Sequence, residues 1–253
     1  MDSIRIELVE FFEEMRIEVP KFNRGSYNRI FLAAFEKHKE LLDRISEACD
    51  EASKEDRPFV MLEIASILPE YVKSKLGAFE KKKDNIFIDH NMNMAIYIIP
   101  VLTYTHDMYC EKVARMMVDI WNEKKVTHLN LGFSTYEGIA NGFKKKLCYI
   151  TTAVCEQQHK ADDCYELTSL RDYRDSYLMQ TEEGRALVEE YYDIAPGLVM
   201  IMDMQNEREA IYADIYDRYI LPCIRYIEKG QNEECSTLYQ KMVKSLQNQY
   251  FYS

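Results

Sequence analysis

Apolar residues recur at intervals of three and four along most of the chain, which is the spacing of one face of an α-helix. Residues 3–17 carry such a stripe, and Ser26 stands where it can cap the long helix that the next stripe predicts. Pro69 is expected to break or kink the segment that follows. Residues 85–123 form the most apolar region, which Pro100 divides, so we expect two helices there, or one kinked helix, buried on most sides.

The second half of the chain shows the same periodicity with short interruptions. A loop is expected over residues 124–133, a turn near Gly184 and a break near Pro196. Two helices, at about 205–228 and about 233–251, are expected to close the chain. The pattern therefore predicts an all-α fold, in the form of a compact multi-helix bundle.

Short loops and the lack of any fixed-period repeat favour one compact arrangement that can divide into two helical subdomains. We place the division in the loop near residue 130. This gives an N-terminal helical region, residues 1–130, and a C-terminal helical region, residues 131–253.

Composition narrows the class of protein. Only 8 glycines and 6 prolines occur, fewer than a β-sandwich or a Gly-rich nucleotide-binding fold needs for its turns. The net charge of -11 argues against general nucleic-acid binding and against docking on an anionic membrane. No uninterrupted apolar run approaches the roughly 20 residues that span a bilayer. Because the N-terminus is acidic and amphipathic, unlike a secretory signal, we expect a cytoplasmic protein.

Seven cysteines, an odd number, do not suggest a disulfide framework in a cytoplasmic protein. If residues 148–158 are helical, Cys148, Cys155 and His159 lie within about 20° of one stripe on that helix. Cys155 and His159 are an i, i+4 pair, and Cys164 follows after a turn. Three thiols and an imidazole match a tetrahedral set of metal ligands, which predicts a bound zinc or iron ion.

Other interpretations of these residues stay open. The thiols can be packing residues of the core, and an extended segment would put positions seven apart on opposite faces. Cys148 follows three lysines and can open a helix, so it is the best candidate for a catalytic thiol. His106 and Cys110 form another i, i+4 pair, which could complete a metal site or form a Cys–His dyad if it lay beside the first set.

Two arginines fall in the helical stripe that follows the cysteines. Arg174 shares a heptad-like spacing with leucines and a tyrosine, and Arg171 flanks it. A buried guanidinium needs an anionic partner, and Asp175 stands four residues after Arg171. The arrangement is either an internal salt-bridge network between helices or, together with Arg185, an anion site for a phosphate or a carboxylate.

Three blocks in this region, CYITTAVC, LRDYRDSYL and GRALVEEYYDIAPGLV, resemble the CFI-box type of domain in their order and spacing. That pattern is Cys-aromatic-Ile-x-Thr-Ala, then Leu-Arg-x-aromatic-Arg-Asp, then Gly-Arg, a paired aromatic and a proline. The resemblance covers about residues 148–196. The matching residues are Cys148, Tyr149, Ile150, Thr152, Ala153, Leu170, Arg171, Tyr173, Arg174, Asp175, Gly184, Arg185, Tyr191, Tyr192 and Pro196. It implies one structural module that contains Cys148 and the arginine cluster, and it names no reaction.

Common catalytic motifs are missing from the sequence, which has no His-Glu-x-x-His, no Gly-x-Ser-x-Gly and no phosphate-binding Gly-rich loop. Three functions stay open. The favoured one is a Cys/His metal-binding protein. The second is a thiol-dependent enzyme or redox protein that uses Cys148 with Arg171 and Arg174. The third is a non-enzymatic scaffold with a protein partner or a homo-oligomeric state, in which exposed tyrosines would suit the interface.

Overall fold

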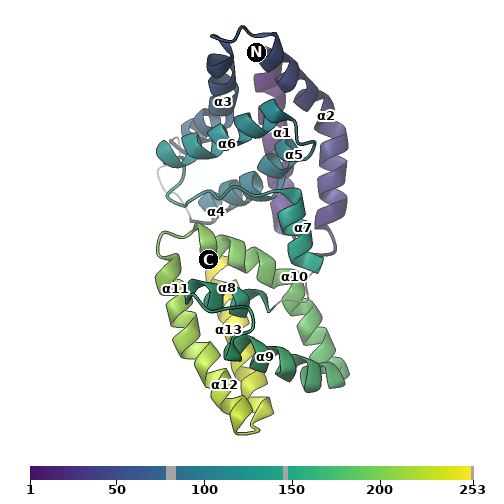
Figure 1. The fold of residues 1–253 in the computed structure, drawn as a ribbon, viewed down its shortest axis with the longest axis vertical. Helices are drawn as coiled ribbons and strands as arrows, with labels where there is room; N and C mark the ends of the chain where they lie inside the picture. The colour runs from purple at the N-terminus through teal and green to yellow at the C-terminus, as the bar shows by residue number, and fades with distance from the viewer. Residues whose placement is uncertain (78–83, 145–147, 252–253) are drawn as a thin grey trace. The chain divides into compact units, whose positions relative to one another are not determined.

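The computed structural model describes residues 1–77, 84–144 and 148–251, and the regular structure in these ranges is entirely helical (Figure 1). The predicted all-α fold is thereby confirmed. The chain forms two compact units, which we call unit 1 (Met1–Asn141) and unit 2 (Gly142–Ser253).

Unit 1 consists of helices packed around one apolar core. α3 packs against α1 and α6, and α2 packs against the same two helices. The stripe over residues 3–17 is confirmed as a helix, whose Leu8, Phe11 and Phe12 are fully buried. The elements are α1 (Asp2–Glu18), η1 (Val19–Lys21), α2 (Tyr27–Glu51), α3 (Arg57–Gly77), α4 (Asp84–Asn93), η2 (Met94–Ile98), α5 (Ile99–Thr103), α6 (Met108–Glu123) and α7 (Tyr136–Lys144), which crosses the boundary to unit 2.

Ser26 precedes α2 as expected, but its hydroxyl does not cap that helix. The hydroxyl donates instead to the carbonyl of Lys21, and the Asn23 side chain accepts from the backbone N–H of Ser26 at 3.0 Å. The turn before α2 is therefore closed by an asparagine rather than by the serine.

The region around Pro100 is one continuous helical stretch rather than two helices. α4 passes through η2, a segment of wider π-helical turns, into α5. Pro100 has no N–H, so it cannot donate to the carbonyl of Ile96, as an α-helix would require, or to that of Ala95, as a π-helix would. The Tyr27 hydroxyl donates to the first carbonyl at 3.1 Å, and the Ser134 hydroxyl donates to the second. Side chains from other segments thus satisfy the backbone groups that the proline leaves unpaired.

Other prolines are also accommodated inside helices. α3 runs through Pro69, and α10 (Glu182–Met204) runs through Pro196, so the breaks expected at these two residues do not occur. A second π-helical segment, η4 (Tyr216–Ile220), again comes just before a proline, Pro222. Proline in this fold changes the pitch of a helix more often than it ends one.

One stretch within the described ranges, residues 85–103, is long and apolar enough to cross a bilayer by length and average composition, although polar residues interrupt it. Its mean hydropathy over an 18-residue window is 1.2, and 89% of that window is buried inside the protein. The core helix of a globular unit has the same properties. The stretch is therefore weak evidence for a membrane span.

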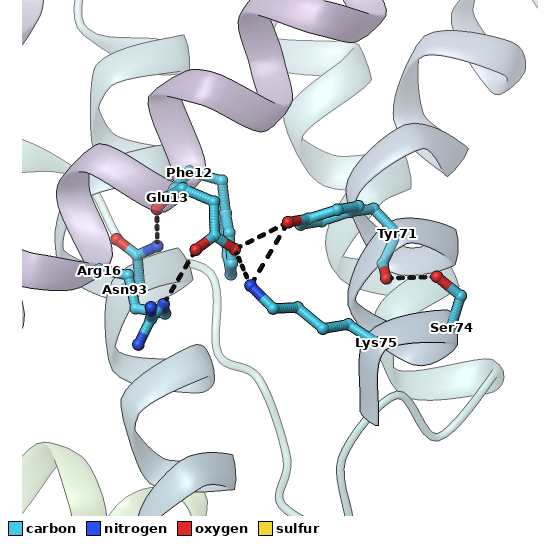
Figure 2. Close-up of polar contacts among 7 residues, drawn as sticks. All are labelled: Phe12, Glu13, Arg16, Tyr71, Ser74, Lys75 and Asn93. Atoms are coloured by element: carbon cyan, nitrogen blue, oxygen red, sulfur yellow. Dashed lines mark hydrogen bonds and ion pairs between the residues drawn. The ribbon is translucent and has the colours of Figure 1, made fainter. Parts of the chain in front are cut away.

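A carboxylate links α1 to α3 at the edge of the unit 1 core (Figure 2). Glu13 accepts hydrogen bonds from the Tyr71 hydroxyl at 3.0 Å and from Lys75 Nζ at 2.7 Å, and Arg16 lies 3.3 Å from its other oxygen. Burial of Glu13 raises its carboxyl pKa, but the hydrogen bonds and positive charges of these neighbours outweigh it and hold the pKa below its usual value. The carboxylate thus stays ionised and ties the two helices together.

Polar side chains of α4 lie deep in the same core. The Asn91 side-chain oxygen accepts from Trp121 Nε1 at 3.1 Å and from the Thr127 hydroxyl at 2.8 Å, while the Asn93 amide donates to the carbonyl of Phe12 at 2.8 Å. His90 is only 4% exposed, and its Nδ1 has no hydrogen-bond partner among the described residues. Of these groups only His90 has a side chain whose ordinary pKa lies near neutral pH, so His90 can make the core of unit 1 sensitive to acid.

Unit 2 is a second helical bundle, which contains the cysteine-rich region. α10 packs against α8, η3 and α13, and α12 packs against α9 and α13. α11, η4 and α12 follow one another along one side of the unit, and α13 returns beside them (Figure 1). The elements are α8 (Tyr149–Gln157), α9 (Tyr165–Ser176), η3 (Leu178–Gln180), α10, α11 (Arg208–Ile215), η4, α12 (Leu221–Glu228) and α13 (Asn232–Tyr250).

The division between the units falls after Asn141 and not near residue 130. Residues 131–141 belong to unit 1 because the Tyr136 ring stacks on Phe31 with 4.4 Å between the ring centroids, and its hydroxyl contacts the Asn28 side chain. These partners lie on α2, far away in the sequence, so the local sequence around Tyr136 does not indicate that this segment packs with the N-terminal region.

Candidate functional site

A pocket of about 340 Å³ lies in unit 2 between the start of α8, α9, η3, α10 and α13. This volume falls within the range of sites that bind small organic molecules. Much of its wall is aliphatic, and four tyrosines from three helices, Cys148 and several polar or charged side chains supply the remainder. The aliphatic residues are Leu170, Leu178, Leu187, Val188, Ile194 and Val243.

Two of the residues singled out in the sequence, Cys148 and Arg174, meet in the wall of this pocket. Cys148 is the residue before α8 and is 7% exposed. Arg174 Nη1 lies 3.9 Å from the Cys148 sulfur and donates a hydrogen bond to the Tyr192 hydroxyl at 2.9 Å. The other edge of the same guanidinium binds both carboxylate oxygens of Asp175, at 2.7 and 2.9 Å. Arg174 thus presents one edge to a surface carboxylate and the other to the pocket.

The electrostatic environment keeps the Cys148 thiol protonated. Burial raises its pKa, and the positive charges of Arg174 and Arg171 only partly oppose that effect. A reactive thiol needs a lowered pKa, so Cys148 is not an activated nucleophile in this structure. The pocket and the Arg174 cation support the prediction of a catalytic thiol at this position, but among the described residues no carboxylate or imidazole is hydrogen-bonded to the thiol.

A chain of hydroxyl groups fixes the first turn of α8 against α10 and α13. The backbone N–H of Ile150 donates to the Tyr191 hydroxyl at 2.9 Å, the Tyr239 hydroxyl donates to the Tyr191 hydroxyl at 3.3 Å, and Thr151 shares a hydrogen bond with Tyr239 at 3.2 Å. Burial raises the pKa of Tyr191 well above its usual value, so the phenol stays neutral. This network holds Cys148 in place at the pocket wall.

The predicted three-arginine anion site is not assembled. Arg171 binds Asp162, with Nη2 2.7 Å from one carboxylate oxygen, and Arg185 donates to the carbonyl of Met179 at 3.0 Å. Of the three, only Arg174 lines the pocket. The internal salt-bridge interpretation therefore describes Arg171 and one edge of Arg174, while Asp175 pairs with its sequence neighbour rather than with Arg171.

The predicted metal ligands are only partly brought together. Helix α8 is confirmed, and Cys148 and Cys155 share one buried cluster with Leu167, against which Cys164 packs. His159 does not join them, because α8 ends at Gln157 and His159 adopts a left-handed backbone conformation (φ 55) with its side chain exposed. Within the ranges that the structure describes, no group of three or more His, Cys, Asp or Glu side chains is arranged to hold a metal ion. A zinc or iron site here stays a prediction, which elemental analysis of the purified protein tests.

The second Cys/His pair lies in unit 1 and is also separated. Cys110 is fully buried, its thiol donates to the carbonyl of Leu42 at 3.5 Å, and burial raises its pKa. His106 points outward with its side chain 69% exposed, 3.3 Å from Glu111. Between them, Asp107 caps α6 by accepting from the backbone N–H groups of Tyr109 and Cys110, so the two side chains leave the turn in different directions.

Several residues of the pocket were not recognised from the sequence as functional candidates. Nothing in the local pattern around Tyr239 indicates that its hydroxyl reaches Tyr191 on another helix. Lys244 and Glu190, both exposed, also line the pocket. The only available signal was the concentration of tyrosines late in the chain, which does not specify their partners.

Comparisons of the chain with protein-family models, with curated proteins and with solved structures gave no significant match. The resemblance to the CFI-box type of domain therefore stays a prediction. Function has to be argued from the pocket itself.

Proposed function

We propose that unit 2 is a small-molecule-binding module that holds an amphipathic organic anion in the pocket between α9, α10 and α13. The observation that carries this proposal is a predominantly apolar cavity of about 340 Å³ with one guanidinium edge, that of Arg174, in its wall. Ligand sites in proteins combine an apolar lining with a few polar groups that orient the ligand.

Arg174 would receive the acidic group of the ligand. Its side chain is only 13% exposed, whereas that of Asp175 is 62% exposed, so water weakens the ion pair on the far edge of the guanidinium. The pocket edge donates to the Tyr192 hydroxyl, a neutral acceptor. A carboxylate is a stronger acceptor than a phenol and can take its place.

The tyrosines favour an aromatic or other flat apolar body for the ligand. The rings of Tyr173, Tyr191, Tyr192 and Tyr239 all line the cavity, and Tyr191 and Tyr239 already pack at 5.7 Å between centroids with their rings near perpendicular. Aromatic rings gain from edge-to-face and offset contacts with further rings. Naphthalene carboxylate is therefore a suitable first probe, with naphthalene carboxamide as its uncharged counterpart.

Isothermal titration with these two probes tests the proposal. We expect saturable binding of the carboxylate that Arg174→Gln weakens by about tenfold or more, since a hydrogen bond to a charged group contributes about 1.5–3 kcal/mol. The uncharged amide should lose far less. Arg171→Gln is the matched control, because that arginine binds the exposed Asp162 outside the pocket, and it should alter the affinity by about twofold at most.

Two results would contradict the proposal. One is the absence of saturable binding of either probe to the folded protein. The other is an equal loss of affinity in both arginine variants, which would show that surface charge, and not the pocket, attracts the anion. Val243→Trp gives an independent check, because it fills the pocket from α13 and should abolish binding without touching Arg174.

The predicted protein partner or homo-oligomer remains a second interpretation of this unit. It is compatible with a ligand pocket, and size-exclusion chromatography with light scattering tests it directly. A monomer at all concentrations would leave the ligand-binding proposal in place and remove the homo-oligomer.

A further inference from the structure

A pair of cysteine thiols lies outside the ligand site, where α8 ends and α9 begins. Cys155 is in the last turns of α8, and Cys164 is the residue just before α9. Cys164 packs against the buried cluster that contains Cys155. The connection between them is tightly folded, since the N–H of Lys160 donates to the Cys155 carbonyl at 2.9 Å and the N–H of Cys164 to the Ala161 carbonyl at 3.0 Å.

The two thiols differ in their access to solvent. Cys155 is fully buried, whereas Cys164 is partly exposed. A reagent in solution can therefore reach Cys164 first, and Cys155 stands behind it.

We propose that Cys164 and Cys155 form a thiol–disulfide exchange site for low-molecular-weight disulfides. Cys164 is the attacking thiol and Cys155 the resolving thiol. The proposal is independent of the ligand pocket, because it uses the far end of α8 and neither Arg174 nor the cavity.

The exchange balances in two steps. Cys164 loses its proton and attacks one sulfur of the reagent disulfide, which breaks the reagent S–S bond, forms a mixed disulfide and releases one small thiol that takes the proton. Cys155 then loses its proton and attacks the Cys164 sulfur, which forms the Cys155–Cys164 bond and releases the second small thiol. The protein is oxidised by two electrons and the reagent is reduced by two. An excess of small thiol reverses both steps.

Residues around the pair support the connection in the reduced state. Lys160 Nζ contacts the Glu166 carboxylate and donates to the Tyr216 hydroxyl at 2.5 Å, and that hydroxyl donates to Glu166 at 2.7 Å. This network ties the loop between the two cysteines to α9 and η4. It holds the connection in place while Cys164 packs against the cluster of Cys155 without a covalent link.

A second thiol pair in the same unit serves as an internal control for the effect of solvent access. The Cys223 thiol lies 3.8 Å from the backbone carbonyl oxygen of Cys235, so these two residues are also close in space. Both are fully buried. Proximity is thus common to the two pairs, and access to solvent is what differs.

The test is to treat the full chain with oxidised glutathione, quench with an alkylating reagent and map the cysteines by mass spectrometry. We expect the Cys155–Cys164 disulfide to form faster than a Cys223–Cys235 disulfide by about tenfold or more, since two fully buried thiols react only after the protein opens locally. Cys155→Ser should accumulate glutathione on Cys164, and Cys164→Ser should leave Cys155 unmodified. Excess glutathione should restore both wild-type thiols.

Three outcomes would overturn the proposal. The first is a mixed disulfide that persists on Cys164 in the wild-type chain. The second is a Cys155–Cys164 disulfide that forms no faster than the Cys223–Cys235 disulfide. The third is glutathione on Cys155 in the Cys164→Ser variant. Circular dichroism of each variant before treatment verifies that the helices are intact, so that none of these outcomes can be attributed to unfolding.

Discussion

His90 should make unit 1 lose stability in mild acid. The imidazole is 4% exposed, stacks on Phe12 with 5.6 Å between ring centroids, and has an unpartnered Nδ1 within the described residues. Burial lowers its pKa to about 4, the positive charges of Arg16 and Lys75 act in the same direction, and Glu13 opposes them. The folded protein therefore holds His90 in its neutral form.

The sign and size of the effect follow from proton linkage. An unfolded histidine has a pKa near 6.5, so below that pH the unfolded chain binds a proton that the folded chain does not bind. The free energy of unfolding is unaffected above this range and falls as the pH drops towards 4. A gap between pKa values of 6.5 and about 4 corresponds to about 3 kcal/mol in full, and to about 2 kcal/mol at about pH 5.

The assay can use the only tryptophan of the chain. Trp121 is fully buried in unit 1 and donates to Asn91, the neighbour of His90, so its fluorescence reports the unfolding of this unit. Urea titrations at about pH 7.5 and about pH 5 should show a loss of stability that is about 2 kcal/mol larger in the wild type than in His90→Gln. His106→Asn is the matched control, because its side chain is 69% exposed, and it should keep the wild-type loss.

An equal loss of stability in the wild type and in His90→Gln would refute this reasoning. The carboxyl groups of unit 1, including Glu13, titrate alike in the two proteins, so their contribution cancels in the comparison. Any overall destabilisation by the substitution cancels as well, since the readout is the difference between two pH values within each protein.

Two further substitutions probe backbone contacts on which the fold depends. Gly184→Ala should destabilise unit 2 by about 1–3 kcal/mol or more, because the new Cβ would lie 2.0 Å from the carbonyl oxygen of Leu178. Gly142→Ala is the control, because its new Cβ would have no atom within 4 Å and should be tolerated. Thermal unfolding followed by circular dichroism compares the two variants. Tyr27→Phe should cost unit 1 about 1–3 kcal/mol in urea unfolding, since it leaves the carbonyl of Ile96 buried without its hydroxyl donor; an unchanged unfolding midpoint would show that this hydrogen bond is dispensable.

The helical elements could be predicted because the 3.6-residue periodicity is a local signal. It identified α1, α2 and the two closing stretches, whereas it left the cysteine stretch open between a helix and an extended segment, and the structure makes Tyr149–Gln157 helical. Prolines were less informative, because whether a proline ends a helix depends on distant partners. At Pro100 those partners are Tyr27 and Ser134, and no sequence pattern near the proline indicates them.

The candidate site was predictable where its residues are linked by helical spacing. Cys148 and Arg174 were both singled out, and the structure places them 3.9 Å apart. His159 failed as a member of the set because α8 ends two residues before it, and the left-handed turn carries it away from the thiols. The pocket itself depends on α13, whose position beside α10 cannot be read from local sequence.

The measurement that tests the central claim most directly is the alkylation rate of Cys148 with and without bound naphthalene carboxylate. Cys148 lines the pocket, whereas Cys164 lies outside it and is partly exposed, so the two thiols report on the cavity and on the surface within one experiment. The account predicts that saturating probe slows labelling of Cys148 by about tenfold or more and leaves Cys164 unchanged. Saturable binding that leaves the Cys148 rate unaltered would place the ligand elsewhere and contradict the account.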